Sequence, residues 1–139
     1  MNRLKIQLDN GAFRPERAHA DDAGLDLRSP VDVIVKPGEA VDIDTGVHVA
    51  IPHGFVGMLK SKSGLLFHNQ ITSEGVVDCG FCGSIHVNLM NHSGWHYTVH
   101  KGDKITQLVI LPIILPEIEL VSALEETERG SQGFGSSGR

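Results

Sequence analysis

The sequence contains few cysteines, few aromatic residues and no long hydrophobic run, and each shortage excludes a class of protein. Two cysteines, Cys79 and Cys82, are too few for the disulfide framework of a small secreted domain. The longest apolar run, residues 108–115, is interrupted by Pro112 and is much shorter than the roughly 18 residues of a membrane-spanning helix. With 12 Lys and Arg against 17 Asp and Glu, the chain lacks the basic surplus needed to bind a nucleic-acid backbone.

The length and the N-terminal pattern further restrict the class of protein. A chain of 139 residues has the size of one folded domain. Near its start, Leu4, Ile6 and Leu8 alternate with polar residues, unlike the continuous apolar segment of a secretory signal. We therefore expect a cytoplasmic protein with reduced cysteines, and we expect neither a membrane nor a nucleic acid among its partners.

Alternating hydrophobic residues predict many short β-strands. Period-two patterns cover residues 4–8, 31–35, 41–43, 47–51, 85–89 and 118–120. Turn sequences rich in glycine, proline, asparagine and aspartate separate these segments. Outside them, only residues 63–68 offer a turn or two of helix. The pattern predicts an all-β fold, a jelly-roll-like distorted β-barrel with at most one short helix.

The composition changes after Glu125. Residues 126–139 are polar and glycine-rich and contain one aromatic residue, Phe134. We therefore divide the chain into a β-barrel domain, residues 1–125, and a flexible C-terminal arm, residues 126–139. An ordinary frayed terminus is one interpretation of this arm. A single phenylalanine among glycines instead indicates a segment that folds over a ligand.

Four other segments combine glycine, hydroxyl and charged groups. Asp26 lies inside a short apolar strand, where a carboxylate is costly unless it meets a cation, a metal ion or several N–H donors. Residues 61–65, SKSGL, lie at an apparent strand-to-helix junction, where free backbone N–H groups favour anions. A glycine-containing segment predicts a β-hairpin with Asp78 at its entry and Phe81 near its tip. Gln107 lies in the fourth segment, just before an apolar run.

Two sets of residues have spacings that suggest a metal site. Cys79 and Cys82 could form half a zinc site or a redox motif, but no second cysteine pair and no βαβ pattern accompanies them. His92, His96 and His100 recur every four residues in a segment that reads as a strand, so they need not converge. Solvent-facing histidines are the simpler interpretation.

In order along the chain, the segments AGLDL, SKSGL, GVVDCGFCGSI, GDKITQL and RGSQGFGSSG resemble the five motifs of the trimeric dUTP diphosphatase (dUTPase) family. The resemblance covers nearly the whole chain, and residues 45–54 also look like the family's stretch before its second motif. It implies hydrolysis of dUTP to dUMP and diphosphate, with Mg²⁺ chelated by the triphosphate and active sites shared among the subunits of a homotrimer. Such an activity limits uracil incorporation into DNA and supplies dUMP for dTMP synthesis.

The resemblance also implies roles for individual residues. Asp78 would be the general base that activates the water attacking the α-phosphorus, and Gln107 would contact the α-phosphate and that water. Asp26 would pair with the cation of the second motif or with a metal-bound water, and would not itself ligate Mg²⁺. The implied substrate-binding residues are Lys62, Ser63, Gly64, Val77, Phe81, Arg129, Phe134, Gly135 and Ser136.

Within that set, the resemblance assigns the parts of the nucleotide to different residues. Phe81 would pack under the deoxyribose and exclude a ribose 2′-OH, and the backbone from Val77 onward would read O4 and N3–H of uracil. Phe134 would stack on the uracil and Arg129 would bind the γ-phosphate. The glycine and serine residues around Phe134 would let the arm close over the substrate, which favours the second interpretation of the arm.

Four residues depart from the usual family pattern. Lys62 stands in place of an arginine, so a point charge replaces a bidentate fork. Phe81 stands in place of a tyrosine and keeps the ring without the hydroxyl. Cys82 and Ser84 replace an arginine and a glutamate of the third motif. That pair often looks like a structural or intersubunit ion pair, so its loss concerns assembly contacts more than chemistry.

Two other functions stay open on the sequence. A dCTP deaminase has a similar fold, but its second motif usually carries a double serine where this chain has Ser63 and Gly64, and its third motif usually carries a glutamate and a histidine. A nucleotide-dependent regulator that binds a protein partner is the alternative from another class. Asp78 and the Phe134 arm argue against a scaffold without catalysis.

Overall fold

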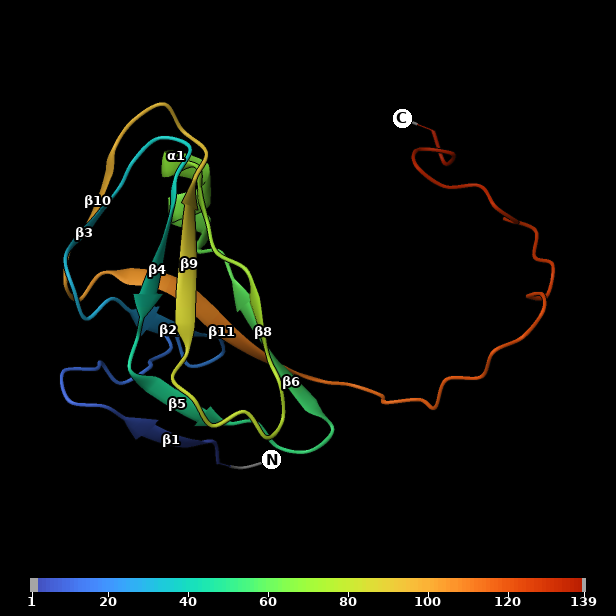
Figure 1. Cartoon of the computed structure of the whole chain (residues 1–139), viewed down its shortest axis with the longest axis horizontal. Helices are drawn as coiled ribbons and strands as arrows, with labels where there is room; N and C mark the ends of the chain where they lie inside the picture. The colour runs from blue at the N-terminus through green and yellow to red at the C-terminus, as the bar shows by residue number, and fades with distance from the viewer. Residues whose placement is uncertain (1–2, 139) are drawn as a thin grey trace.

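The computed structural model describes residues 3–138 and consists of small antiparallel sheets with one helix (Figure 1). The first two residues of the predicted domain and the last residue of the predicted arm lie outside this range. In chain order the elements are β1 (Lys5–Leu8), β2 (Gly24–Arg28), β3 (Val33–Val35), β4 (Ala40–Asp44), β5 (Val47–Ala50), β6 (Phe55–Lys60), α1 (Ser63–Asn69), β7 (Ile71–Thr72), β8 (Gly75–Val77), β9 (His86–Asn91), β10 (Tyr97–Val99) and β11 (Lys104–Pro112).

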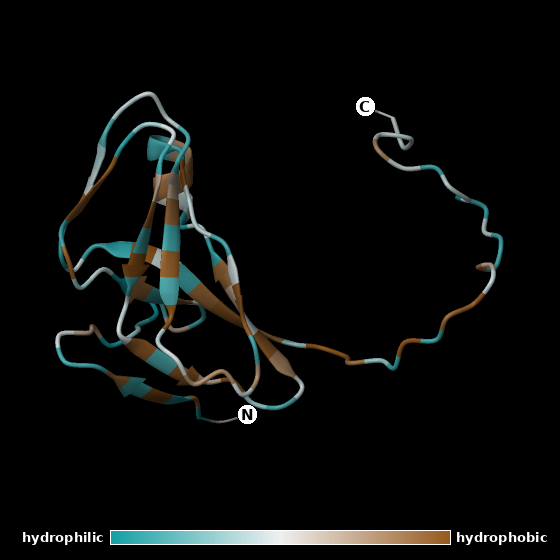
Figure 2. Cartoon of the chain, viewed as in Figure 1, coloured by the Kyte–Doolittle hydropathy of each residue, from teal (hydrophilic) through white to brown (hydrophobic). Residues whose placement is uncertain are grey.

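Two sheets provide most of the framework. One has the strand order β2-β11-β6-β8 and the other β4-β9-β7, while β1 pairs with β5 and β3 with β10. Hydrophobic residues from these sheets face a shared core, and polar residues alternate with them along the strands (Figure 2). The fully buried side chains of this core include Leu27, Ile43, Leu89, Ile105 and Leu108. The predicted all-β, jelly-roll-like fold is confirmed.

The single helix, α1, follows β6 directly and agrees with the short helix predicted from the sequence. It ends at Gln70, which adopts the left-handed conformation at φ 54° and donates its N–H to the carbonyls of Leu65 and Leu66. Within residues 3–138, the structure contains no helix long and apolar enough to cross a membrane.

The segment after β8 does not form the predicted hairpin. β8 pairs with β6, whereas β9 pairs with β4 and β7, so the two strands belong to different sheets. Residues 78–85 are instead a loop that crosses between the sheets, with Gly80 in the left-handed region at φ 87°. The hairpin prediction is wrong because alternating strands around a glycine turn look the same whether they pair with each other or with other strands.

The chain leaves the sheets after β11 (Figure 1). Ile118 and Leu120, which were expected to form a strand, lie in no strand and are 91% and 94% exposed. That prediction is wrong because alternation produces a strand only where a neighbouring strand can accept its hydrogen bonds. Similarly, β1 forms as predicted, but Ile6 and Leu8 are exposed, because within residues 3–138 β1 pairs with β5 alone.

Asn91, at the end of β9, is a fully buried polar residue that connects two segments of chain. Its Nδ2 donates hydrogen bonds to the carbonyls of Val35, at 2.9 Å, and Trp95, at 2.7 Å. Its Oδ1 accepts a hydrogen bond from the backbone N–H of Ser93 at 2.9 Å. The side chain therefore fixes the β9–β10 connection against β3.

We expect Asn91→Ala to lower the free energy of unfolding by about 2–4 kcal/mol, because the buried Val35 carbonyl loses its side-chain donor and the Trp95 carbonyl keeps only the donor Ser93 Oγ. The matched control is Asn88→Ala, an exposed position on the same strand, for which we expect a change of no more than about 0.5 kcal/mol. Urea unfolding of both variants at one protein concentration measures the difference. Equal stability of the two variants would contradict a structural role for Asn91.

Candidate active site

Asp26 is the most deeply buried charged group of the predicted site. It lies on β2 with 3% of its side chain exposed, in contact with Lys62 through Oδ1 and 2.8 Å from Lys104 Nζ through Oδ2. Burial alone would raise the pKa of Asp26, but hydrogen bonds and charge attraction from Lys104 and Lys62 together hold this pKa below its usual value. Asp26 is therefore an ionised carboxylate between two ammonium groups.

Gln107 lies on β11 opposite both Asp26 of β2 and Lys60 of β6. Its Nε2 donates a hydrogen bond of 3.1 Å to the carbonyl of Ser61. A Cβ atom at Gly24 would lie 2.2 Å from Gln107 Oε1, so only glycine at that position leaves room for the amide. The side chain of Gln107 therefore lies over β2 at the edge of the sheet.

Hydrogen bonds fix the junction between β6 and α1. Ser61 Oγ accepts a hydrogen bond from the Ser73 N–H at 2.9 Å and donates one to the Ser73 carbonyl at 3.1 Å. Behind it, Ser73 Oγ donates to Thr106 Oγ1 at 2.8 Å within the core. Ser63 and Gly64 begin α1 on the exposed side, and the space beside the Gly64 Cα is open.

These residues form one group at one edge of the four-stranded sheet, which we call the β2-edge group. Its predicted members are Asp26, Lys62, Ser63, Gly64 and Gln107. The structure adds Lys104, for which no role is predicted from the sequence. The signal that could have found it is a buried carboxylate that needs a cation, together with the position of Lys104 in the same motif as Gln107.

Val77, Asp78 and Phe81 form a second group, the β8-loop group. Val77 is buried at the end of β8, Asp78 follows it on the surface, and Phe81 is half-exposed. The Phe81 ring lies against Gly83, where a Cβ atom would meet it at 2.7 Å. A cavity of about 230 Å³ lies between β8, Phe81 and Ile85.

The two groups lie at opposite edges of the same sheet. In the order β2-β11-β6-β8, Asp26 on β2 is three strand spacings from β8, about 14 Å, and Gln107 on β11 is two strand spacings from β8, about 10 Å. Along β6, the partner of Val77 is Gly57 and the partner of Gln107 is Lys60, a further offset of three residues, about 10 Å. One chain therefore does not bring Asp78 and Gln107 to the same phosphorus atom.

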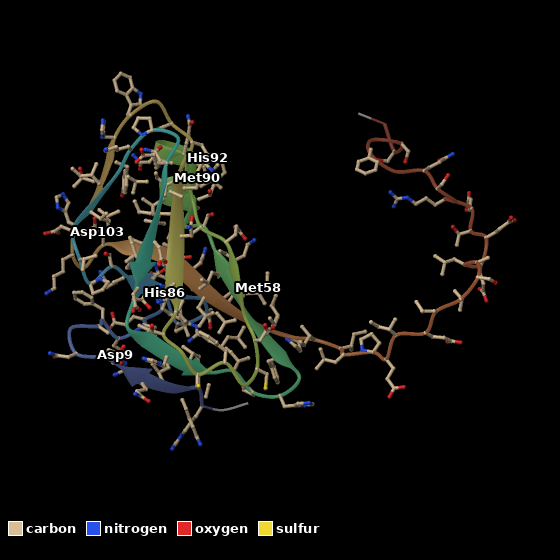
Figure 3. The ribbon with its side chains drawn as sticks, in the orientation of Figure 1. Asp9, Met58, His86, Met90, His92 and Asp103 are labelled. Atoms are coloured by element: carbon tan, nitrogen blue, oxygen red, sulfur yellow. The ribbon has the colours of Figure 1, made fainter. Side chains whose placement is uncertain are left out.

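The arm residues lie away from both groups. Arg129 Nε donates a hydrogen bond to the Gln132 carbonyl within the arm itself, at 2.9 Å. Phe134 is fully exposed, and Gly135 and Ser136 are exposed beside it. The arm extends away from the sheets, and its side chains project into solvent (Figure 3).

The histidines and cysteines considered as a metal site are not grouped. His92, His96 and His100 are exposed, as predicted, and His92 at the end of β9 (Figure 3) faces Thr72 Oγ1 at 2.7 Å. Cys79 and Cys82 are exposed free thiols. Within the described residues, no three His, Cys, Asp or Glu side chains come together in a way that could hold a metal ion.

Comparison with known proteins identifies the family. The family model described as dUTPase matches residues 12–138. The deoxyuridine 5′-triphosphate nucleotidohydrolase of Gloeothece citriformis is 41% identical over 140 residues, which cover 98% of this chain and 97% of that protein. The β2-edge group and the β8-loop group therefore belong to a chain that is similar to this relative over 98% of its length.

Solved structures agree with the sequence match. The Staphylococcus bacteriophage 80alpha dUTPase, described with dUPNHPP, superimposes with a TM-score of 0.92 at 34% identity, covering all of both chains. A variant of the dUTPase from phage phi11 of S. aureus, described with a coordinated structural Mg(II) ion, has a TM-score of 0.82 at 33% identity, covering 90% of this chain and 100% of that one. The chain belongs to the dUTPase family.

Proposed function

We propose that the protein hydrolyses dUTP to dUMP and diphosphate. The observation that carries this proposal is the presence of Asp78 on the β8–β9 loop together with the β2-edge group, in a chain that matches the dUTPase family over residues 12–138. The 80alpha relative described with dUPNHPP supports a uridine nucleotide as the substrate. In a cytoplasmic setting this activity would limit uracil incorporation into DNA and supply dUMP.

In the proposed reaction, Asp78 acts as general base on a water molecule. The water oxygen bonds to the α-phosphorus, its proton passes to Asp78, and the bond from the α-phosphorus to the bridging oxygen breaks in line to release diphosphate. Gln107 orients the water and the α-phosphate. Lys62 and the first residues of α1, Ser63 and Gly64, bind the phosphate chain, so positioning and charge stabilisation lower most of the barrier.

Selectivity arises in the β8-loop group and the arm. Phe81 packs under the deoxyribose and leaves no space for a 2′-OH. Backbone groups from Val77 onward pair with O4 and N3–H of uracil, and cytosine presents the opposite donor and acceptor pattern there. The arm brings Phe134 onto the uracil ring and Arg129 to the γ-phosphate, and Gly135 and Ser136 allow it to close.

We also propose that the active protein is a homotrimer with shared active sites. The separation of Asp78 from Gln107 across the four-stranded sheet supports this, since both groups are needed at one phosphorus atom. A neighbouring subunit would supply the β8-loop group to the β2-edge group. The arm, which extends away from its own sheets, is free to reach a site on another subunit.

The donor groups fit an Mg²⁺ ion that is carried by the substrate. The carboxylate of Asp26 is already paired with two lysines, so it is suited to hold a cation or a water and not to bind the metal directly. Mg²⁺ usually keeps several waters and takes its other ligands from phosphate oxygens, which suits a site without a carboxylate cage. When bound, Mg²⁺ would neutralise the charge that develops on the leaving diphosphate.

Product analysis tests the proposed function. Purified protein with Mg²⁺ is given dUTP, dCTP, dTTP or UTP in separate reactions, and both diphosphate and the nucleotide product are measured. We expect diphosphate and dUMP from dUTP alone. Formation of dUTP from dCTP would identify a deaminase instead, and no reaction with any nucleotide would favour a binding protein.

Asp78→Asn should leave folding and dUTP binding intact and lower kcat by about 10²–10⁴-fold, because the amide cannot accept the proton from water. The matched control is Asp21→Asn, an exposed aspartate outside both groups, which should keep full turnover. Steady-state kinetics measures kcat, and calorimetric titration with a non-hydrolysable dUTP analogue measures binding. Near-normal turnover of Asp78→Asn would remove Asp78 from the role of base.

Deleting the residues after Glu128 should lower kcat/KM for dUTP by at least about 100-fold, because the open site admits water and loses the contacts of Arg129 and Phe134. The melting temperature should stay unchanged, since the arm side chains pack against no sheet. Kinetics and thermal unfolding of the truncated protein measure both effects. Full activity after truncation would refute closure of the arm.

Lys104→Met should destabilise the protein by about 1–3 kcal/mol at pH 7, because buried Asp26 loses one of its two cations and Lys104 is itself partly solvated. The pKa of Asp26 is depressed in the folded protein, so its ionic contribution is present above its ordinary value of 3.8 and is lost as the pH falls below that value. The difference from wild type should therefore shrink below pH 3.8.

Urea unfolding at pH 7 and at low pH measures this change. The matched control is Lys101→Met, an exposed lysine three residues before β11, which should change stability by less than about 0.5 kcal/mol. A destabilisation of Lys104→Met that persists undiminished in acid would show that the lysine acts by packing and not by charge.

A further inference from the structure

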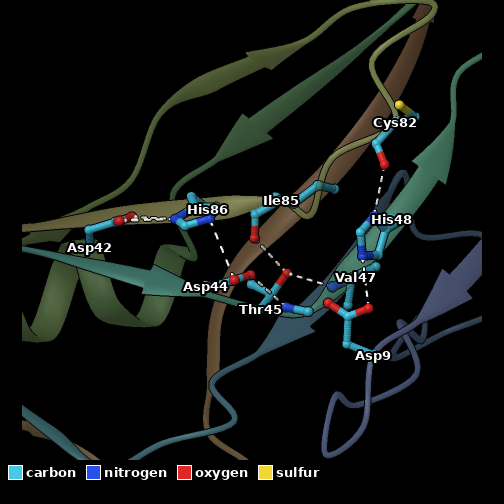
Figure 4. A network of polar contacts seen from close by, with 10 residues as sticks. Asp9, Asp42, Asp44, Thr45, Val47, His48, Cys82, Ile85 and His86 are labelled. Carbon is cyan, nitrogen blue, oxygen red and sulfur yellow. Dashed lines mark hydrogen bonds and ion pairs between the residues drawn. The ribbon is translucent and has the colours of Figure 1, made fainter.

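His48, on β5, connects the loop that carries Phe81 to the N-terminal part of the chain (Figure 4). Its Nδ1 lies 2.8 Å from the carbonyl oxygen of Cys82, and its Nε2 lies 3.0 Å from Oδ1 of Asp9. The side chain is 21% exposed, so these contacts are partly shielded from water. None of the five motifs contains His48, and the mechanism above does not use it.

Both partners of the His48 ring are hydrogen-bond acceptors. A backbone carbonyl and a carboxylate have no proton to donate, and a neutral imidazole has only one N–H. Both contacts are therefore hydrogen bonds only when the ring is an imidazolium with two N–H groups. Consistent with this, the hydrogen bond to the Cys82 carbonyl, followed by that to Asp9, raises the pKa of His48 above its ordinary value.

The His48 contact holds a loop that has few other attachments. After the loop, Ile85 is fixed to the sheet through its N–H, which donates to the Val47 carbonyl at 2.8 Å, and its carbonyl, which accepts from Thr45 Oγ1 at 2.7 Å. Within residues 79–83, the Cys82 carbonyl makes the one hydrogen bond to a side chain that the described part of the chain contains.

Packing beneath the loop is also loose. A cavity of about 520 Å³ separates it from β1 and β5, with Ile6 and Ile51 on one side and Phe81 on the other. The loop also has Cys82 and Ser84 where the resemblance led us to expect an ion-pairing arginine and glutamate. The end of the loop is held by hydrogen bonds from Ser84 to Asp44 and from Ile85 to Val47, so the hydrogen bond from His48 is the side-chain attachment nearest to Phe81.

We propose that His48, as an imidazolium, is a positioning residue that holds Phe81 in place for the deoxyribose, so that deoxynucleotide recognition weakens as His48 loses its proton. This inference rests on the proposed function for its effect on the substrate. The coupling between His48 and the loop does not depend on that function. The substrate affected is the uridine deoxynucleotide, through the sugar that Phe81 contacts.

The other titratable groups near His48 are few and can be tested separately. The N-terminal segment contributes Lys5 and Asp9, the turn before β5 contributes Asp44, and the loop contributes the thiols of Cys79 and Cys82. On β9, His86 Nε2 faces the carboxylate of Asp44, which also lies near His48. The Nδ1 of His86 lies 2.9 Å from Oδ2 of Asp42 (Figure 4). The hydrogen bond to Asp42 raises the pKa of His86 as well, so a variant of His86 is a necessary control.

The direction of the pH effect follows from the raised pKa of His48. The charged ring, which donates to both acceptors, contributes fully below the ordinary value of 6.5. As the pH rises through the higher pKa of the folded protein, the positive charge and one of the two hydrogen bonds are lost. The affected range is therefore above pH 6.5, where carboxylate protonation plays no part.

Nuclear magnetic resonance on the nucleotide-free protein tests the coupling directly. The ring signals of His48 are titrated together with the backbone amides of Phe81 and Cys82 in the wild-type protein and in Asp9→Asn. We expect the loop amides to follow the His48 midpoint and both to move to lower pH in Asp9→Asn. Amide signals of Phe81 and Cys82 that do not shift over the His48 titration would overturn the proposal, whether or not the protein hydrolyses dUTP.

Kinetics tests the consequence for recognition. KM for dUTP and the ratio of kcat/KM for dUTP and UTP are measured from pH 6 to pH 9. The ratio cancels the titration of the phosphates, which both nucleotides share. We expect KM of the wild type to rise about three- to tenfold across the His48 titration and the ratio to fall with it, since a charged hydrogen bond is lost.

His48→Gln should show the raised KM already at the acid end, with a flat profile, while kcat changes little. His86→Gln and His53→Gln, an exposed histidine in the β5–β6 turn, should keep the wild-type profile. A His48→Gln profile that matches the wild type would refute the positioning role. If the pH dependence of KM instead disappears in His86→Gln, the effect belongs to the Asp42–His86–Asp44 cluster.

Discussion

The strand order of the four-stranded sheet constrains the rest of the molecule. β11 lies between β2 and β6, so the residues on β11 and β2 face one edge, while β8 and the loop after it lie at the other. A fixed spacing of about 4.8 Å between strands keeps these edges apart whatever the side chains do. In the proposed reaction, Asp78 and Gln107 would come from different copies of the chain, so the sheet order supports the shared site proposed above.

At the β2 edge, electrostatics decides what the site can bind. A buried carboxylate between two ammonium groups leaves a net charge of one positive unit, which attracts a phosphate chain without a broad basic surface. Two separate lysines can also contact two different partners, whereas one arginine presents its donors from a single rigid group. If Lys62 binds the phosphate chain as proposed, Lys104 still pairs with Asp26, so the buried carboxylate keeps one cation when Lys62 turns to the substrate.

Five of the six alternating segments, residues 4–8, 31–35, 41–43, 47–51 and 85–89, overlap β-strands. In β4, β5 and β9 the alternation matches burial, whereas β1 is exposed along its length. The sequence could not predict which strands pair, since pairing is decided by contacts between distant segments. The hairpin expected around Asp78 and Phe81 failed for that reason, and the strand expected at Ile118 failed because no partner strand lies beside it. The β2-edge residues could be predicted from motifs, whereas Lys104 and His48 became visible only through their distances to Asp26 and Cys82.

The loop after β8 stays attached to β5 although two side chains of its motif differ from the usual family pattern. An ion pair within the loop would depend on the side chains at positions 82 and 84, which here are cysteine and serine. His48 instead binds the main-chain carbonyl of Cys82, which any residue at that position would offer. The side chain at position 82 is then free to vary, and the requirement moves to position 48 and to the carboxylate of Asp9, which together with the Cys82 carbonyl raises the pKa of the imidazole. A neutral residue at position 9 would make the same histidine a weaker anchor at neutral pH.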